Sequence, residues 1–157
     1  MSLEDKNKKG RELLIQLLKS GKTVDVTAQG LSMFPVLLPD DILRVKPVKS
    51  GQLLRGQIIV YEKDSKIISH RYIKTVNGEI ICKGDGLIYN DAPFNNENLL
   101  GVVVARIRKN NTILFNNRLK LFSGLIITYL TPFTGLFFHY LSFAWHKWIY
   151  QKQDQNP

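Results

Sequence analysis

Apolar positions near the N-terminus recur with a helical period. The run at residues 11–19, RELLIQLLK, favours a helix, and Gly21 stands just past its end, where a glycine often closes a helix. The run is too short and too charged to span a bilayer, and we expect no signal peptide before it. It predicts a helix that docks on the following domain, with contact to a partner as the alternative.

From residue 23 the period changes to two. Val24, Val26 and Ala28 alternate with polar residues, as in a half-buried strand that leads to Gly30. Further strands are predicted at residues 42–45, 57–62, 67–75, 79–83 and 100–108. Polar breaks separate them, and Asn77-Gly78 is a strong hairpin signal. The pattern predicts a mainly β fold, a small antiparallel sheet or barrel-like domain.

The last third of the chain is apolar. Residues 121–145 form a run of 25 residues without a formal charge, and Trp145, Trp148 and Tyr150 cluster at its end like an interfacial aromatic belt. About 20 apolar residues suffice to span a bilayer. Thr131-Pro132 interrupts the run and is typical of a helix start, so two short helices compete with one kinked span. We expect an apolar helical tail that associates with a membrane.

Length and composition favour a globular protein with one main domain. The chain has 157 residues, of which 44% are hydrophobic and 22% charged. We assign an N-terminal helix to residues 1–22, a β-rich domain with the candidate chemistry to 23–117, the apolar tail to 118–150 and a polar end to 151–157.

The net charge of +9 is unevenly distributed. Residues 31–100 carry nine positive and eight negative side chains, whereas residues 101–157 carry seven and one. The excess flanks the apolar run, with Arg106, Arg108, Lys109, Arg118 and Lys120 before it and Lys147 and Lys152 after it. Anionic lipid headgroups are therefore a better partner than nucleic acid. Because more basic residues precede the run, we expect the β-rich domain on the cytoplasmic face of the membrane.

A candidate nucleophile follows the first predicted strand. Ser32 lies in Gly30-Leu31-Ser32-Met33-Phe34-Pro35, and a serine hydroxyl needs a base within hydrogen-bond reach. Among the three histidines, only His70 lies outside the apolar tail. Asp85 and Asp91 supply carboxylates that can orient such a base. In isolation the first stretch is typical of an ordinary Gly/Pro turn, but Ser, His and Asp in this order favour a nucleophilic site.

The remaining reactive side chains carry less chemistry. Cys82 alternates with Ile80 in a strand-like run, which predicts a small buried residue rather than a nucleophile. His139 and His146 lie in the apolar region without neighbours that bind metals. We expect neither a metal nor another cofactor.

Four motifs in sequence resemble those of the type I signal peptidases. They are Ser32-Met33 with Pro35, then the strand-like residues 56–61, then His70-Arg71, then Lys83-Gly84-Asp85 with the later Asp91. The chain is most similar to the endoplasmic-reticulum and archaeal branch, in which histidine stands where bacterial enzymes have lysine. The resemblance covers residues 24–106. It implies an antiparallel β fold and a serine endopeptidase that cleaves a peptide or protein precursor, with small residues favoured before the cut.

The resemblance also implies roles for the residues. His70 takes the proton of Ser32, an acyl-enzyme forms, and His70 then activates the hydrolytic water. Asp91 is expected to orient His70, while Asp85 shapes the loop or supports the histidine, although the two aspartates could be exchanged. Gly30, Ser32 and Met33 are expected at the substrate and oxyanion site.

The chain departs from the family at several positions. Many signal peptidases have a serine, which helps to hold the oxyanion, where this chain has Gly30. Asp40-Asp41 replaces a common Gly-Asp, Gln57 replaces the aspartate of Arg-Gly-Asp, and we expect no N-terminal anchor. Gly30 makes a catalytically inactive peptide-binding relative the main alternative. Self-cleaving repressors share the Ser-Met motif, but they use a lysine base and carry a DNA-binding domain, for which 23 residues leave no room. A structural membrane protein is the remaining alternative.

Overall fold

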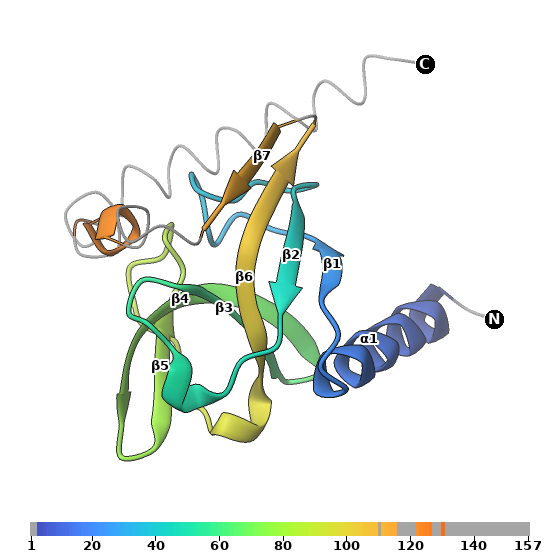
Figure 1. The fold of residues 1–157 in the computed structure, drawn as a ribbon, viewed down its shortest axis with the longest axis horizontal. Helices are drawn as coiled ribbons and strands as arrows, with labels where there is room; N and C mark the ends of the chain where they lie inside the picture. The colour runs from blue at the N-terminus through green and yellow to red at the C-terminus, as the bar shows by residue number, and fades with distance from the viewer. Residues whose placement is uncertain (1–2, 110, 116–121, 127–129, 131–157) are drawn as a thin grey trace.

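A computed structural model describes residues 3–109, 111–115, 122–126 and 130 (Figure 1). One helix, α1 (Leu3–Lys19), precedes seven strands. The strands are β1 (Val24–Thr27), β2 (Ile42–Lys46), β3 (Ile58–Lys63), β4 (Lys66–Val76), β5 (Glu79–Lys83), β6 (Leu99–Arg108) and β7 (Asn111–Leu114). Two short 3₁₀ turns, Ser50–Gln52 and Asn96–Asn98, precede β3 and β6.

All described strands belong to one antiparallel sheet, with the order β1-β2-β6-β3-β4-β5 and β7 paired to β6. The prediction of a mainly β, antiparallel fold with an N-terminal helix is therefore confirmed. The hairpin between β4 and β5 turns at Asn77 and Gly78, which both have positive φ, as the Asn-Gly signal requires. β7 was not predicted, and α1 begins eight residues before the helical run at 11–19, within the segment 1–22 assigned to the N-terminal helix.

The two faces of the sheet carry separate apolar clusters. On one face Leu18 of α1 packs with Leu43, Val45, Val60 and Val103, so the helix docks on the sheet as expected. On the other face Tyr61, Tyr72, Ile80 and Cys82 pack with Phe94 from the segment before β6. Both clusters lie beside β3, which therefore forms the centre of the molecule.

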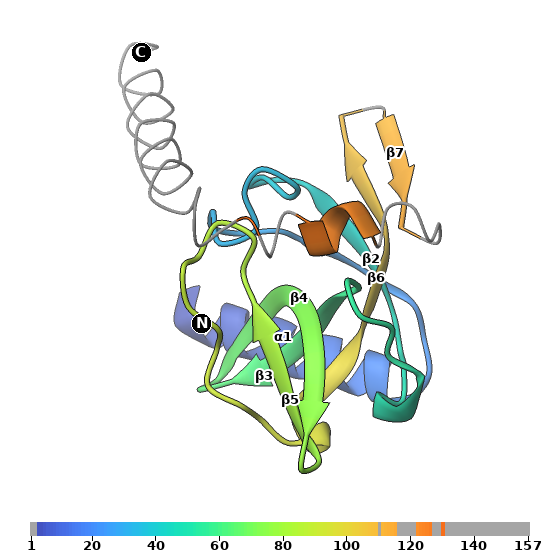
Figure 2. The same cartoon turned by 90° about the vertical axis from the view of Figure 1, so that its left-hand side faces the viewer.

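The apolar tail lies mostly outside the described residues. These include residues 122–126, which are helical, but not Thr131-Pro132, the aromatic belt, His139 or His146. Within the part of the chain that the structure describes, no helix is both long and apolar enough to cross a membrane. Figure 2 shows residues 122–126 beside β4. A Cβ at Gly124 would lie 2.2 Å from Nη1 of Arg71, so a side chain there would require the guanidinium to shift.

Candidate active site

The predicted nucleophile lies in a loop that is closed at its base. The Ala28 N–H donates to the Asp41 carbonyl (2.8 Å), and the Asp40 N–H donates back to Ala28 (3.1 Å), which joins the two ends of residues 28–41. Asp40 has φ 68, a conformation that favours glycine and that aspartate tolerates better than most residues. The departure from Gly-Asp therefore leaves a residue that still suits this backbone.

Asp41 fastens this loop to β6. Its buried carboxylate accepts from Arg108 Nε and Nη2 at 2.6 and 2.7 Å and from the Leu38 N–H at 2.8 Å. Burial acts to raise the pKa of Asp41, but the bonds from Arg108 and Leu38 outweigh it, so the pKa lies below its ordinary value of 3.8. Arg106, also on β6, donates to the Val36 carbonyl at 2.5 Å. Two arginines thus hold the loop that carries Ser32.

Ser32, His70 and Asp91 form one chain of hydrogen bonds. Ser32 Oγ lies 2.9 Å from Nε2 of His70, and Nδ1 of His70 lies 2.6 Å from Oδ2 of Asp91. His70 is buried in β4, which fixes the ring between residues 28–41, here called the nucleophile loop, and the loop after β5. The structure brings these three predicted residues together in the order that nucleophilic catalysis needs.

Tyr61 also contacts these hydrogen-bonded residues, although the sequence did not predict it. Its hydroxyl donates to Asp91 Oδ2 at 2.9 Å and lies 3.5 Å from His70 Nδ1. The ring is fully buried and stacks on Phe94 at 4.1 Å between centroids. Burial, and then the Asp91 carboxylate, raises the pKa of Tyr61 far above its ordinary value. The hydroxyl therefore acts as a neutral hydrogen-bond donor.

Asp85 occupies a different position from Asp91. It is fully buried and accepts bidentate hydrogen bonds from Arg71, from Nε to Oδ1 at 2.7 Å and from Nη2 to Oδ2 at 2.5 Å. Nη1 of Arg71 donates to the Gly56 carbonyl at 2.6 Å. Asp85 thus ties the loop after β5 to Arg71, the residue that follows His70. Of the two predicted aspartates, Asp91 contacts the histidine and Asp85 pairs with Arg71.

The loop after β5 packs directly on the nucleophile turn. The Gly86 N–H donates to the Ser32 carbonyl at 2.9 Å. A Cβ on Gly84 would lie 2.5 Å from that same carbonyl oxygen, and one on Gly86 would lie 3.2 Å from the Leu31 carbonyl. Glycine at these positions lets the two backbones approach closely. Lys83-Gly84-Asp85 is therefore a packing motif around Ser32.

The predicted oxyanion residues have different surroundings. Gly30 is exposed, has φ 79, and a Cβ there would meet nothing within 4 Å. Met33 is buried in the cluster below the loop, so its side chain faces the core. Within the described part of the chain, the N–H groups of Ser32 and Met33 have no backbone acceptor.

Two groups on β5 have shifted pKa values. Cys82 is fully buried, and burial followed by the Asp91 charge raises the pKa of its thiol, which disfavours a nucleophilic thiolate. Burial lowers the pKa of Lys83, although Asp85 opposes the shift. Among the described side chains, no group of three or more His, Cys, Asp or Glu could hold a metal ion.

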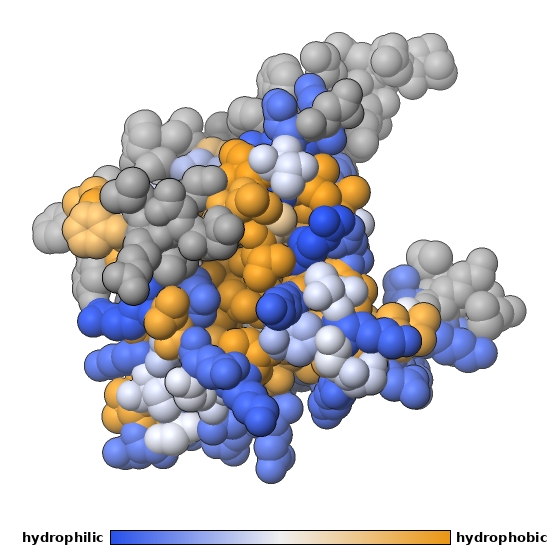
Figure 3. All heavy atoms as spheres, viewed as in Figure 1, coloured by the Kyte–Doolittle hydropathy of each residue, from blue (hydrophilic) through white to orange (hydrophobic). Residues whose placement is uncertain are grey.

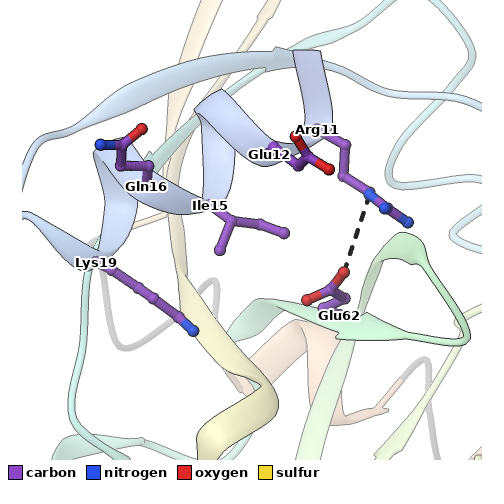
Figure 4. A pocket seen from close by; sticks show the side chains of 6 residues that line it. All are labelled: Arg11, Glu12, Ile15, Gln16, Lys19 and Glu62. Atoms are coloured by element: carbon purple, nitrogen blue, oxygen red, sulfur yellow. Dashed lines mark ion pairs between the residues drawn. The ribbon is translucent and has the colours of Figure 1, made fainter. Parts of the chain in front are cut away.

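An open hollow of about 450 Å³ lies away from the triad, where α1 meets β3 (Figure 4). Its lining mixes charges of both signs, and Arg11 Nε faces Glu62 at 3.9 Å across it. Ser32, His70 and Asp91 do not line it. The hollow thus adds no chemistry to the candidate site.

Comparison of the chain with protein-family models, with curated proteins and with solved structures gave no match.

Proposed function

We propose that this chain is a serine endopeptidase of the signal-peptidase type that cleaves a peptide or protein precursor. The observation that carries the proposal is the contact chain from Ser32 Oγ through His70 to Asp91, with distances of 2.9 and 2.6 Å. Two features of the resemblance support it. The loop after β5 packs on the nucleophile turn, and Gln57 Oε1 accepts from the Leu54 N–H at 2.9 Å, as the aspartate of Arg-Gly-Asp could.

The reaction begins with proton transfer from Ser32. Nε2 of His70 takes the hydroxyl proton while Oγ attacks the scissile carbonyl carbon, whose oxygen becomes an oxyanion. The tetrahedral intermediate then breaks its C–N bond, and the proton on Nε2 goes to the leaving amine. The product is an acyl ester on Ser32.

Water completes the cycle. His70 Nε2 takes a proton from the water as it attacks the ester, and the second tetrahedral intermediate releases a carboxylic acid and returns the proton to Oγ. Asp91 holds the imidazole with its Nδ1 proton directed toward the carboxylate and stabilises the transient imidazolium. The N–H groups of Ser32 and Met33 are the donors that we assign to the oxyanion.

We further propose that residues 118–150 attach the enzyme to a membrane, with the catalytic domain on the cytoplasmic side. The charge distribution around residues 121–145 supports this placement. Phe122 and Ile126 lie one helical turn apart and expose 64% and 44% of their surface. Gly124 sits against Arg71, next to His70, so the tail would begin close to the catalytic centre.

Gly30 favours one other function, an inactive peptide-binding protein. Its position lacks the serine hydroxyl of many signal peptidases, and loss of one oxyanion donor typically costs about 10²–10³ in rate. Such a protein would bind an extended peptide along a sheet edge, which β1 provides. The band of apolar side chains over β6 in Figure 3 suits a peptide with apolar side chains under either function.

Labelling of Ser32 separates the two functions. A fluorophosphonate probe should add one mass increment to the wild-type protein, located at Ser32 by peptide mapping, and none to Ser32→Ala. The His70→Ala protein should be labelled at least 100 times more slowly. A folded wild-type protein that is not labelled at Ser32 would contradict the peptidase and leave the binding function.

A further inference from the structure

Asp91 stands in a segment without regular secondary structure, yet the proposed chemistry needs its carboxylate in a fixed place. Residues 84–93 form neither helix nor strand. The backbone of Asp91 is tied by its N–H to the Cys82 carbonyl at 2.8 Å. That bond fixes the main chain but leaves rotation about the side-chain bonds free.

The side chain is held from β3 by a hydroxyl. Tyr61 donates to Oδ2, the same oxygen that faces His70 Nδ1. Tyr61 is itself immobilised, because its ring is fully buried and stacked on Phe94 at an interplanar angle of 14°. A donor on the central strand thus fixes an acceptor on a loop.

We infer that Tyr61 is a positioning residue that holds the Asp91 carboxylate and limits the negative charge that this carboxylate presents to His70. This inference rests on the proposed function. A hydroxyl that shares Oδ2 withdraws part of the charge that would otherwise stabilise the imidazolium. Tyr61 acts through Asp91 and does not touch the substrate.

Among the residues that the structure describes, few groups around His70 and Asp91 could produce the same effect. The titratable groups that face this pair are the Tyr61 hydroxyl from β3, Ser32 from the nucleophile loop and the Cys82 thiol from β5. Lys63, at the end of β3, reaches the Ala92 carbonyl at 3.4 Å. Arg71 directs its guanidinium to Asp85 instead.

Tyr61→Phe tests the inference, because it removes the hydroxyl and keeps the ring against Phe94. Tyr72→Phe is the matched control: Tyr72 belongs to the same apolar cluster, but its hydroxyl bonds to Thr75 Oγ1 at 2.9 Å. The rate of fluorophosphonate labelling at Ser32 is measured across pH for all three proteins, together with their melting temperatures. The His70 ring is followed by ¹⁵N NMR over the same pH range.

Tyr61→Phe should lower the labelling rate above neutral pH by about 10-fold, the effect of losing one hydrogen bond to a charged group. The pH at which half of His70 is protonated should rise by at least about half a pH unit. Tyr72→Phe should change neither quantity. A Tyr61→Phe protein with the wild-type rate, or one that is slow but has an unchanged His70 midpoint, would overturn the inference.

The NMR measurement keeps this inference separate from the proposed function. If the wild-type protein is not labelled at Ser32, the peptidase proposal fails, while the His70 midpoint can still be compared between wild type and Tyr61→Phe. An unchanged midpoint in that comparison overturns the role of Tyr61. A His70 midpoint that is higher in Tyr61→Phe than in wild type supports the role of Tyr61 in positioning Asp91, even if the protein is not a peptidase.

Discussion

The two ring nitrogens of His70 have different partners, and the difference assigns their roles. Nδ1 faces the Asp91 carboxylate, which can only accept a hydrogen bond. Nδ1 therefore carries the hydrogen in the neutral ring. Nε2 then directs its lone pair at Ser32 Oγ. This tautomer is the one that can remove the hydroxyl proton.

His70→Ala should therefore remove nearly all cleavage, leaving less than a few per cent of the wild-type rate. On the proposed function, the wild-type rate should also fall on acidification, because a protonated His70 ring has no lone pair for Ser32. Cleavage of a precursor peptide followed by mass spectrometry across pH measures both effects. Retention of substantial activity in folded His70→Ala would show that another base serves Ser32.

The two aspartates should respond differently to the same substitution. Asp91→Asn should lower turnover by up to about 10⁴, because an amide can hold the wrong tautomer of His70, while leaving the fold intact. Asp85→Asn removes one charge of the buried pair with Arg71 and should cost about 3 kcal/mol of stability. Turnover and melting temperature of both variants decide the assignment. A larger loss of turnover at Asp85 with equal melting temperatures would reverse it.

At the scale of elements, the position of the nucleophile loop depends on β6. Arg106 and Arg108 reach residues 36 and 41 across separations of 70 and 67 residues in sequence. Local sequence patterns predict neither contact, because each joins a strand to a loop far away in the chain. The sequence placed Ser32 at a strand end but contained no local sign of what holds it.

Arg108→Met should destabilise the protein by about 3–5 kcal/mol, because it leaves the buried Asp41 carboxylate without its cation. Arg44→Met is the matched control, since Arg44 and Asp25 pair on the exposed surface, where such pairs contribute at most about 1 kcal/mol. Urea unfolding at neutral pH measures both. Equal losses from the two substitutions would contradict the structural role of Asp41.

The pair of Asp41 and Arg108 also determines how the free energy of unfolding changes at acid pH. The pKa of Asp41 is lower in the folded protein than its ordinary value of 3.8, so its contribution to stability is present above that value and is lost as pH falls through the lower, folded-state pKa. In Arg108→Met this contribution is largely absent. The stability difference between wild type and the variant should therefore shrink toward pH 3, as urea unfolding at several pH values can show.

Elements with clear periodicity were predictable, and the others were not. Each predicted strand lies within two residues of an observed one, because alternation reports which face is buried. β7 has four residues, mostly exposed, and so gives no such signal. Tyr61 was missed for the opposite reason: inside an apolar strand it looks like an ordinary core residue, and only the fold shows its hydroxyl beside Asp91.

At the scale of the whole molecule, the charge distribution predicts a topology. In spheroplasts or right-side-out vesicles, residues 1–110 should resist protease added outside, because the basic residues before the apolar run keep that side cytoplasmic. Detergent-permeabilised vesicles provide the control for cleavability. Digestion from outside would contradict the cytoplasmic placement, and release by carbonate would contradict a membrane span.

The contacts from β6 to the nucleophile loop also set a point in synthesis before which the enzyme cannot act. Ser32, His70 and Asp91 all leave the ribosome before Arg106 and Arg108, yet the loop that carries Ser32 has its two arginine anchors only once these residues can pair. On the proposed function, a nascent chain that ends before residue 106 holds every catalytic group and remains inert. Completion of β6 would then be the step of synthesis that makes the proposed site functional.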